Sequence, residues 1–136
     1  MNTPFDGRNP AAPAAARPRS LAVVSAGTSD PSTTTMLANR AATRATAIAA
    51  ERGITIQTRV IDLRSIAEDI TSALVTQHIS PALQEASDVL RDADAIIAST
   101  PVYKAGASGL FTAFFQVLDN DLLIGTPVAL AATAGS

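Results

Sequence analysis

The sequence predicts an α/β fold: a doubly wound parallel sheet with helices on both faces. From residue 21 onward, short apolar runs alternate with longer segments in which apolar residues recur at helical spacing. Strands that alternate with helices are joined by right-handed crossovers, which make neighbouring strands parallel. The run at 95–100 is apolar on both faces, which is typical of a strand in the middle of such a sheet.

Composition indicates one soluble domain and excludes several classes of function. The chain has 136 residues, of which 47% are hydrophobic and 16% are charged, which is enough for a single core. A net charge of −2 argues against nucleic acid as a partner, because that binding depends on a basic surface. The chain has no cysteine, which excludes disulfides, thiolate nucleophiles and cysteine-based metal sites. No apolar run approaches the roughly 20 residues of a membrane-spanning helix, so we expect no membrane association.

Residues 1–20 are predicted to form a disordered leader rich in alanine and proline. They show no hydrophobic periodicity, and prolines at positions 4, 10, 13 and 18 interrupt the segment. It lacks the continuous apolar stretch of a secretory signal, so we expect a cytoplasmic protein. Residues 21–136 are expected to form the folded domain.

The first half of this domain contains two expected strands and a long helix. Residues 21–26 form a buried apolar run, and Ser32 or Thr33 is placed to cap a helix that ends at Gly53. Residues 54–63 alternate apolar with polar side chains, as in a strand nearer a sheet edge, and this strand ends at Asp62. A dinucleotide-binding fold would place a ribose-binding acid there. The first loop lacks the G-x-G-x-x-G motif of that fold, so we interpret Asp62 as structural.

The second half contains two more expected strands and the remaining helices. Helical spacing is weaker over 64–78 and clear after Ser80, where a serine followed by proline is a strong start signal. The central strand at 95–100 comes next, and Ser108 then opens a helix with a dense stripe of leucine and phenylalanine. A fourth strand is expected at 127–132.

Three loops follow the first, third and fourth expected strands and therefore lie at one edge of the sheet, beyond which such folds bind their ligands. The first loop, 27–34, carries glycine, proline and hydroxyl side chains ahead of a helix. Unpaired N–H groups and the helix dipole favour an anion such as phosphate there. The second loop, 101–109, holds the only tyrosine and the only lysine. The plainer alternative is that the hydroxyls cap a helix, that Tyr103 packs and that Lys104 is a solubilising charge.

These segments resemble the flavodoxin-like, NAD(P)H-dependent FMN reductase family. The similarity lies in SAGTSDPSTT at the first loop, in IDLR after the second strand and, most specifically, in STPVYKAGASGLFTAFF around the second loop. It covers roughly 21–136. The family's sheet continues with a fifth strand and a closing helix. By this resemblance the last strand and helix are missing here, which would leave the apolar strand at 127–132 as an exposed edge.

The resemblance implies an FMN site built from the three loops. The first loop would surround the phosphate, the second would run beside the isoalloxazine ring, and the third would begin a further flavin-facing loop. The cofactor-binding residues implied in this way are Gly27, Thr28, Ser29, Ser32, Thr33, Thr34, Pro101, Val102, Tyr103, Lys104, Thr133, Ala134 and Gly135.

The activity implied is hydride transfer from NADPH or NADH to N5 of FMN. The reduced flavin would pass to a free acceptor or to a partner such as a flavin-dependent monooxygenase, and a homo-oligomer is expected. Because the cofactor carries the chemistry, no catalytic triad or metal is required, which suits a chain with one histidine. Two alternatives stay open: an FMN-binding electron carrier without nicotinamide turnover, and an inactive truncated copy.

Overall fold

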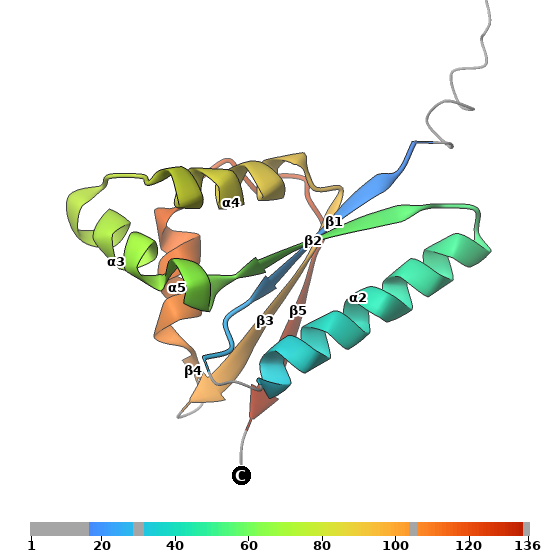
Figure 1. The fold of residues 1–136 in the computed structure, drawn as a ribbon, viewed down its shortest axis with the longest axis horizontal. Helices are drawn as coiled ribbons and strands as arrows, with labels where there is room; N and C mark the ends of the chain where they lie inside the picture. The colour runs from blue at the N-terminus through green and yellow to red at the C-terminus, as the bar shows by residue number, and fades with distance from the viewer. Residues whose placement is uncertain (1–16, 29–31, 104–105, 135–136) are drawn as a thin grey trace, which may run out of the picture.

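A computed structural model describes residues 17–28, 32–103 and 106–134 of the chain. Four parallel strands form its sheet in the order β2 (Ile56–Asp62), β1 (Arg19–Ser25), β3 (Ala95–Tyr103) and β5 (Val128–Ala134), as Figure 1 shows. The predicted α/β class and parallel sheet are confirmed. So are the central place of the third predicted strand, now β3, and the edge position of the second, now β2.

β1 begins two residues earlier than the sequence pattern predicts. Arg19 pairs with Ile56 of β2, and the Ser20 N–H donates to the Asp94 carboxylate over 2.8 Å. Asp94 N–H donates in turn to the Ser20 carbonyl over 2.8 Å. The predicted boundary after residue 20 therefore falls inside β1, because backbone pairing continues past the apolar run. Residues 1–16 of the expected leader lie outside the described residues.

A two-residue strand, β4 (Gly106–Ala107), was not predicted and pairs antiparallel with the end of β3. Val102 is paired with Ala107 of β4 and also with Ala134 of β5. Since a strand has only two hydrogen-bonding edges, β4 and β5 lie on opposite edges of β3. β4 therefore lies on the β1 side of β3, beyond the point where β1 ends.

Helices cover both faces of the sheet, as predicted. Of the helices in the described part of the chain, α2 (Thr33–Glu51) is the one on one face, while α3 (Ala67–Thr76), α4 (Pro81–Asp92) and α5 (Gly109–Val117) cover the other (Figure 1). A short 3₁₀ helix, Leu63–Ile66, leads from β2 into α3. Among the helices of the described ranges, none combines the length and hydropathy that crossing a bilayer requires.

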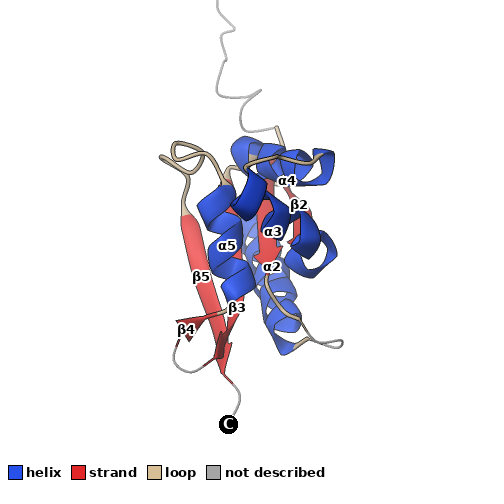
Figure 2. Cartoon of the chain, turned by 90° about the vertical axis from the view of Figure 1, so that its left-hand side faces the viewer, coloured by secondary structure: helices blue, strands red, loops and turns tan. Residues whose placement is uncertain are grey.

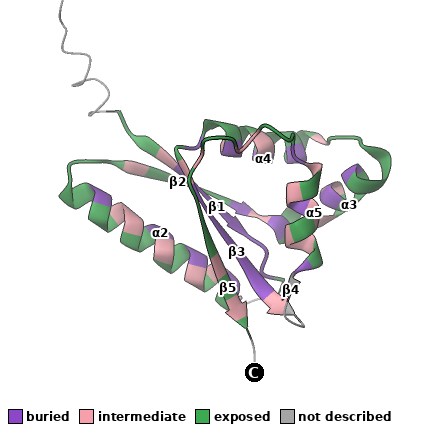
Figure 3. Ribbon diagram, turned by 180° about the vertical axis from the view of Figure 1, so that it is seen from behind, coloured by how far each residue is buried: buried purple, intermediate pink, exposed green. Residues whose placement is uncertain are grey.

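Alternation along β1 divides the core into two parts. Ala22 and Val24 face α3, α4 and α5 and join a large cluster that contains the fully buried Phe114. Leu21 and Val23 face α2 and join a smaller cluster. Figure 3 shows β1 and β3 largely buried between the helical layers, whereas most residues of β5 are exposed.

Serine hydroxyls begin three of the helices, as the sequence predicts. Ser32, Ser80 and Ser108 each accept a hydrogen bond of 3.1 Å from the backbone N–H three residues later. Such a cap satisfies one of the N–H groups that the first turn of a helix leaves unpaired. Ser80 also donates to Asp69 of α3 over 2.8 Å, which ties the start of α4 to its neighbour.

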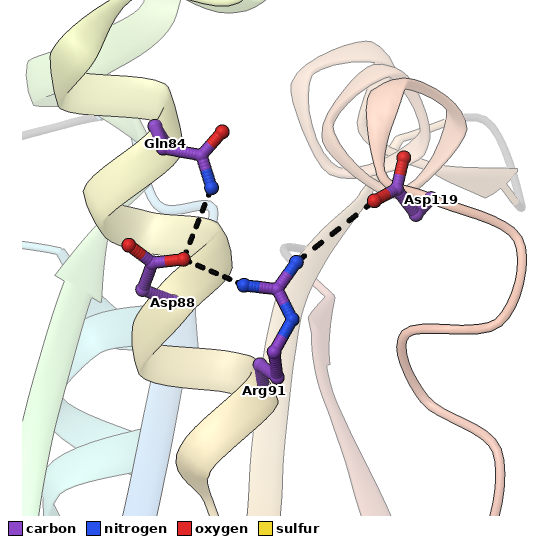
Figure 4. A network of polar contacts seen from close by, with 4 residues as sticks. All are labelled: Gln84, Asp88, Arg91 and Asp119. Carbon is purple, nitrogen blue, oxygen red and sulfur yellow. Dashed lines mark hydrogen bonds and ion pairs between the residues drawn. The ribbon is translucent and has the colours of Figure 1, made fainter.

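A polar network on the outer face of α4 joins this helix to the segment after α5 (Figure 4). Asp88 accepts hydrogen bonds from Gln84 over 3.0 Å and from Arg91 over 2.6 Å. The other guanidinium nitrogen of Arg91 lies 3.9 Å from an oxygen of Asp119. These side chains are exposed, so the ion pairs contribute little to stability, about 0–1 kcal/mol each.

β5 forms an exposed edge, as the resemblance implied. Within the described residues it pairs only with β3, and Leu130 is 76% exposed. Next to it, where α5 runs beside β5 (Figure 2), lies an apolar hollow of about 470 Å³. The residues that line the hollow are Phe111, Thr112, Phe115, Gln116, Leu123, Val128 and Leu130.

The same leucine-to-alanine substitution, made once at a buried position and once at an exposed one, tests which leucines belong to the core. Leu90→Ala removes a fully buried side chain from the larger cluster and should lower the free energy of unfolding by about 2–5 kcal/mol. Leu130→Ala, on the exposed edge, should change it by about 0.5 kcal/mol or less at a protein concentration low enough for the chain to be monomeric. Urea denaturation followed by circular dichroism measures both. Equal losses in the two variants would contradict the assignment.

Candidate functional site

The carboxyl ends of the central strands meet at one edge of the sheet, as predicted. Ser25 at the end of β1 pairs with Ser99, and two residues further along β3 Pro101 pairs with Thr133 near the end of β5. α2 begins at this same edge, with its N-terminus beside the ends of β3 and β5 (Figure 1). The loops after β1, β3 and β5 therefore start from neighbouring points.

The first loop turns tightly at Gly27. A Cβ atom built on this residue would lie 1.9 Å from the Ser32 hydroxyl oxygen and 3.2 Å from the Thr35 hydroxyl oxygen. No larger residue fits without moving Ser32, whose hydroxyl caps α2. Glycine is thus required here for close approach between the end of β1 and the start of the helix.

The start of α2 has the donors that an anion needs. Ser32 Oγ occupies the N–H of Thr35, and the Ser32 carbonyl accepts from Met36 N–H over 3.0 Å. The N–H groups of Thr33 and Thr34 precede the first intrahelical bond and have no partner within the helix. No acidic residue occupies the first turn. N–H groups without a partner inside the helix, hydroxyls and the positive end of the helix dipole together suit a phosphate group.

Hydroxyl pairs connect this first turn to the strands beneath it. Ser25 Oγ lies 2.8 Å from Thr35 Oγ1, and Thr34 Oγ1 lies 2.7 Å from Thr133 Oγ1. Ser99 Oγ lies 3.3 Å from the Val24 carbonyl oxygen and 3.5 Å from that of Thr34. The first turn of α2 is thereby held against the ends of β1, β3 and β5.

The second loop is closed by a hydroxyl on β3. Thr100 Oγ1 accepts from Ser108 N–H over 3.1 Å and donates to the Pro101 carbonyl over 2.9 Å. Pro101 is buried and Val102 is half-buried, and both lie on β3. The backbone of Tyr103 ends this strand. The loop thus leaves and rejoins the sheet within a few residues, because Thr100 joins its two ends.

The remaining residues implied by the resemblance fall in four groups. Thr28, Thr33 and Ala134 are exposed at this edge. Ser32 and Thr133 are partly buried, and Gly27 and Thr34 are buried. Ser29, Lys104 and Gly135 lie outside the described residues.

Some of the hydroxyl side chains that hydrogen-bond the first turn of α2 and the second loop to the strands were not predicted from the sequence. Ser25, at the end of β1, and Ser99 and Thr100, within the second half of β3, are buried polar residues, and Thr35 is the partner of Ser25. A signal was available, because a hydroxyl at the end of a buried apolar strand must find a hydrogen-bond partner. Which partner it finds depends on the tertiary structure.

Asp62 has the structural role that the sequence analysis preferred. Its carboxylate accepts from Arg64 N–H over 3.1 Å and caps the 3₁₀ helix after β2. Within the described ranges, no group of three or more His, Cys, Asp or Glu side chains is arranged to hold a metal ion.

Comparison with known proteins identifies similar sequences. Residues 19–136 match the family model described as NADPH-dependent FMN reductase. The chain is 36% identical to an FMN reductase (NADPH) of Pseudomonas aeruginosa and 35% identical to the NADH-dependent FMN reductase SfnE of Pseudomonas putida, each over 121 residues. These matches cover 88% of this chain and 61% of each relative, so the chain spans about three-fifths of their length.

Solved structures of similar proteins share the fold. An oxidoreductase from Corynebacterium diphtheriae superposes with a TM-score of 0.84 at 39% identity, covering 88% of this chain and 65% of that one. The apo form of an NADH:FMN oxidoreductase, EmoB, gives a TM-score of 0.74 at 30% identity, covering 87% and 59%. The flavodoxin-like architecture expected from the sequence is confirmed.

A matched pair of glycine substitutions tests the tight turn of the first loop. Gly27→Ala should lower the free energy of unfolding by about 1–3 kcal/mol, because the new methyl group displaces the Ser32 cap. Gly109→Ala, at the start of α5 with open space around it, should change it by about 0.5 kcal/mol or less. Urea denaturation compares the two variants. A Gly27→Ala protein as stable as Gly109→Ala would show that the turn is not tightly packed.

Proposed function

The chain belongs to the NADPH-dependent FMN reductase family, and on this premise we propose that it binds FMN at the carboxyl edge of the sheet and reduces it with NADPH or NADH. The observation that carries the proposal is the meeting of the carboxyl ends of β1, β3 and β5 at the N-terminus of α2. Ligands of doubly wound sheets bind at this edge.

In this proposal the first loop and the start of α2 hold the phosphate of FMN. The N–H groups of Thr33 and Thr34 are the donors that the helix itself leaves unused. Ser32 maintains the first turn through its cap. The Thr33 side chain is exposed on the same edge, where its hydroxyl adds a further donor.

The end of β3 is proposed to lie beside the isoalloxazine ring. Pairing of Val102 and Tyr103 with β4 fixes the backbone of this segment. When bound, FMN supplies the redox chemistry, because its N5 accepts a hydride from the nicotinamide C4. The chain contributes orientation and hydrogen bonds.

The two alternatives from the sequence analysis are distinguished by turnover. An electron carrier would bind FMN without oxidising NADPH or NADH, and an inactive copy would do neither. Aromatic residues make up 4% of the chain and it has no tryptophan, which favours an accessible flavin over one shielded as in a carrier. We therefore propose the reductase, with the reduced flavin passing to a free acceptor or to a flavin-dependent monooxygenase.

Self-association is the expected quaternary state of this chain. The unpaired edge of β5, with Leu130 exposed next to an apolar hollow, favours contact with a second copy. Leu130→Lys should shift the apparent mass measured by light scattering toward the monomer. A monomeric unsubstituted protein would refute this part of the proposal.

Comparison of FMN with riboflavin tests the proposed phosphate site. Riboflavin lacks the phosphate, so it should bind about 10–100 times more weakly, which corresponds to about 1.5–3 kcal/mol for hydrogen bonds to a charged group. Isothermal titration calorimetry measures both ligands. Equal affinities would show that the first loop does not hold the phosphate.

Oxidation of NADPH and NADH tests the proposed activity. The protein with FMN should oxidise one or both, followed as loss of nicotinamide absorbance, and omission of FMN should abolish the reaction. FMN binding without oxidation of either nucleotide would favour the carrier. Absence of both binding and oxidation would favour the inactive copy.

A further inference from the structure

Thr34 and Thr133 form the longest-range hydroxyl contact of the site. They are separated by 99 positions in the sequence, yet their Oγ1 atoms lie 2.7 Å apart. Thr34 is in the first turn of α2, and Thr133 lies near the end of β5. The contact therefore joins the phosphate end of the proposed site directly to the strand that leads into the third loop.

The burial of the two residues determines which hydroxyl has a free proton. Each threonine hydroxyl has one proton to donate and two lone pairs that accept. The hydrogen bond between the two residues uses one of their two protons, and the other proton is left for a different acceptor. Thr34 is 2% exposed and has no access to water, so its donor must be satisfied inside the protein. Thr133 is only partly buried, and its donor is able to reach water or a ligand.

We propose that Thr34 is a positioning residue: it donates its proton to Thr133 and thereby directs the Thr133 hydroxyl to donate to the phosphate of FMN. This inference rests on the proposed FMN function and assigns different roles to the hydroxyls of two residues that the resemblance counts among those that bind the cofactor. The Thr133 hydroxyl contacts the ligand, whereas the Thr34 hydroxyl acts through it. The start of α2 and the end of β5 then hold the phosphate together.

The position of Thr133 favours the phosphate as its acceptor. Its hydroxyl lies within hydrogen-bond distance of a residue in the first turn of α2, whose N–H groups point toward the proposed anion. On the other side, Thr133 is paired with Pro101, and the end of β3 continues beyond it as Val102 and Tyr103. The proposed ring site is therefore further along the strands than the Thr133 hydroxyl.

Replacement by valine and by serine tests the inference. Valine keeps the shape of threonine and removes the hydroxyl, whereas serine keeps the hydroxyl. Thr34→Val and Thr133→Val should each weaken FMN binding about tenfold, the low end of the range expected for one hydrogen bond to a charged group. Riboflavin binding should change by less than about twofold, because riboflavin has no phosphate. Thr34→Ser and Thr133→Ser should retain the FMN affinity.

The variant that carries both valine substitutions shows whether the two hydroxyls act through one hydrogen bond to the phosphate or through two independent ones. If Thr34 acts through Thr133, the Thr34→Val, Thr133→Val protein should bind FMN no more weakly than the weaker single variant. Thr43→Val is the matched control, because Thr43 is an exposed threonine further along α2, and it should leave both affinities unchanged. Calorimetry with FMN and with riboflavin measures all the variants.

The outcomes separate this inference from the function on which it rests. An unsubstituted protein without FMN affinity would overturn both. An unsubstituted protein that prefers FMN to riboflavin, together with valine variants that keep the same preference, would overturn only the role of Thr34 and Thr133. Additive losses in the double variant would overturn the positioning role of Thr34. If Thr34→Val fails to fold, Thr133→Val and Thr133→Ser decide the matter, since Thr133 is only partly buried.

Discussion

The parallel pairing of β1, β3 and β5 is the constraint on which the site depends. Parallel strands all point the same way, so their carboxyl ends form one edge, and the register places Ser25 beside Ser99 and Thr133 beside Pro101. α2 returns from the end of β1 and starts at that edge. Without this pairing, the hydroxyls of three distant segments would not meet around the first turn of one helix.

Five buried hydroxyl side chains lie at or near the carboxyl edge of the sheet, next to the candidate site. Ser25, Thr34, Ser99, Thr100 and Ser108 are buried, and burial of a hydroxyl is unfavourable unless it is hydrogen-bonded. Each finds a partner in the described structure, through Thr35, Thr133, backbone carbonyls or one another. Because these partners come from different strands, the polar layer also fixes the position of α2.

Much of the fold could be predicted from the sequence, because apolar periodicity and capping residues are local signals. They located the four parallel strands, the caps at Ser32, Ser80 and Ser108, and the edge at which the strands end. The predicted ends of the third and fourth strands, at 100 and 132, were wrong, because β3 continues to Tyr103 and β5 to Ala134. β4 is too short to have a pattern, and β1 extends over Arg19 and Ser20 through backbone pairing that side-chain polarity does not reveal. The contact between Thr34 and Thr133 joins residues 99 positions apart, so only the folded chain brings it to light.

The uneven coverage of the sheet has a consequence for the dynamics of the molecule. Among the helices of the described residues, α2 is alone on its face, and the side chains it buries are Thr34 and three alanines, which remove little apolar area from water. The opposite layer instead buries Phe114, Leu83 and Leu90. Local opening of α2 therefore costs less free energy than opening of the other layer, and its amides should exchange with deuterium sooner. Since α2 begins at the proposed anion site, an anion bound there would also slow the exchange of the amides in its first turn.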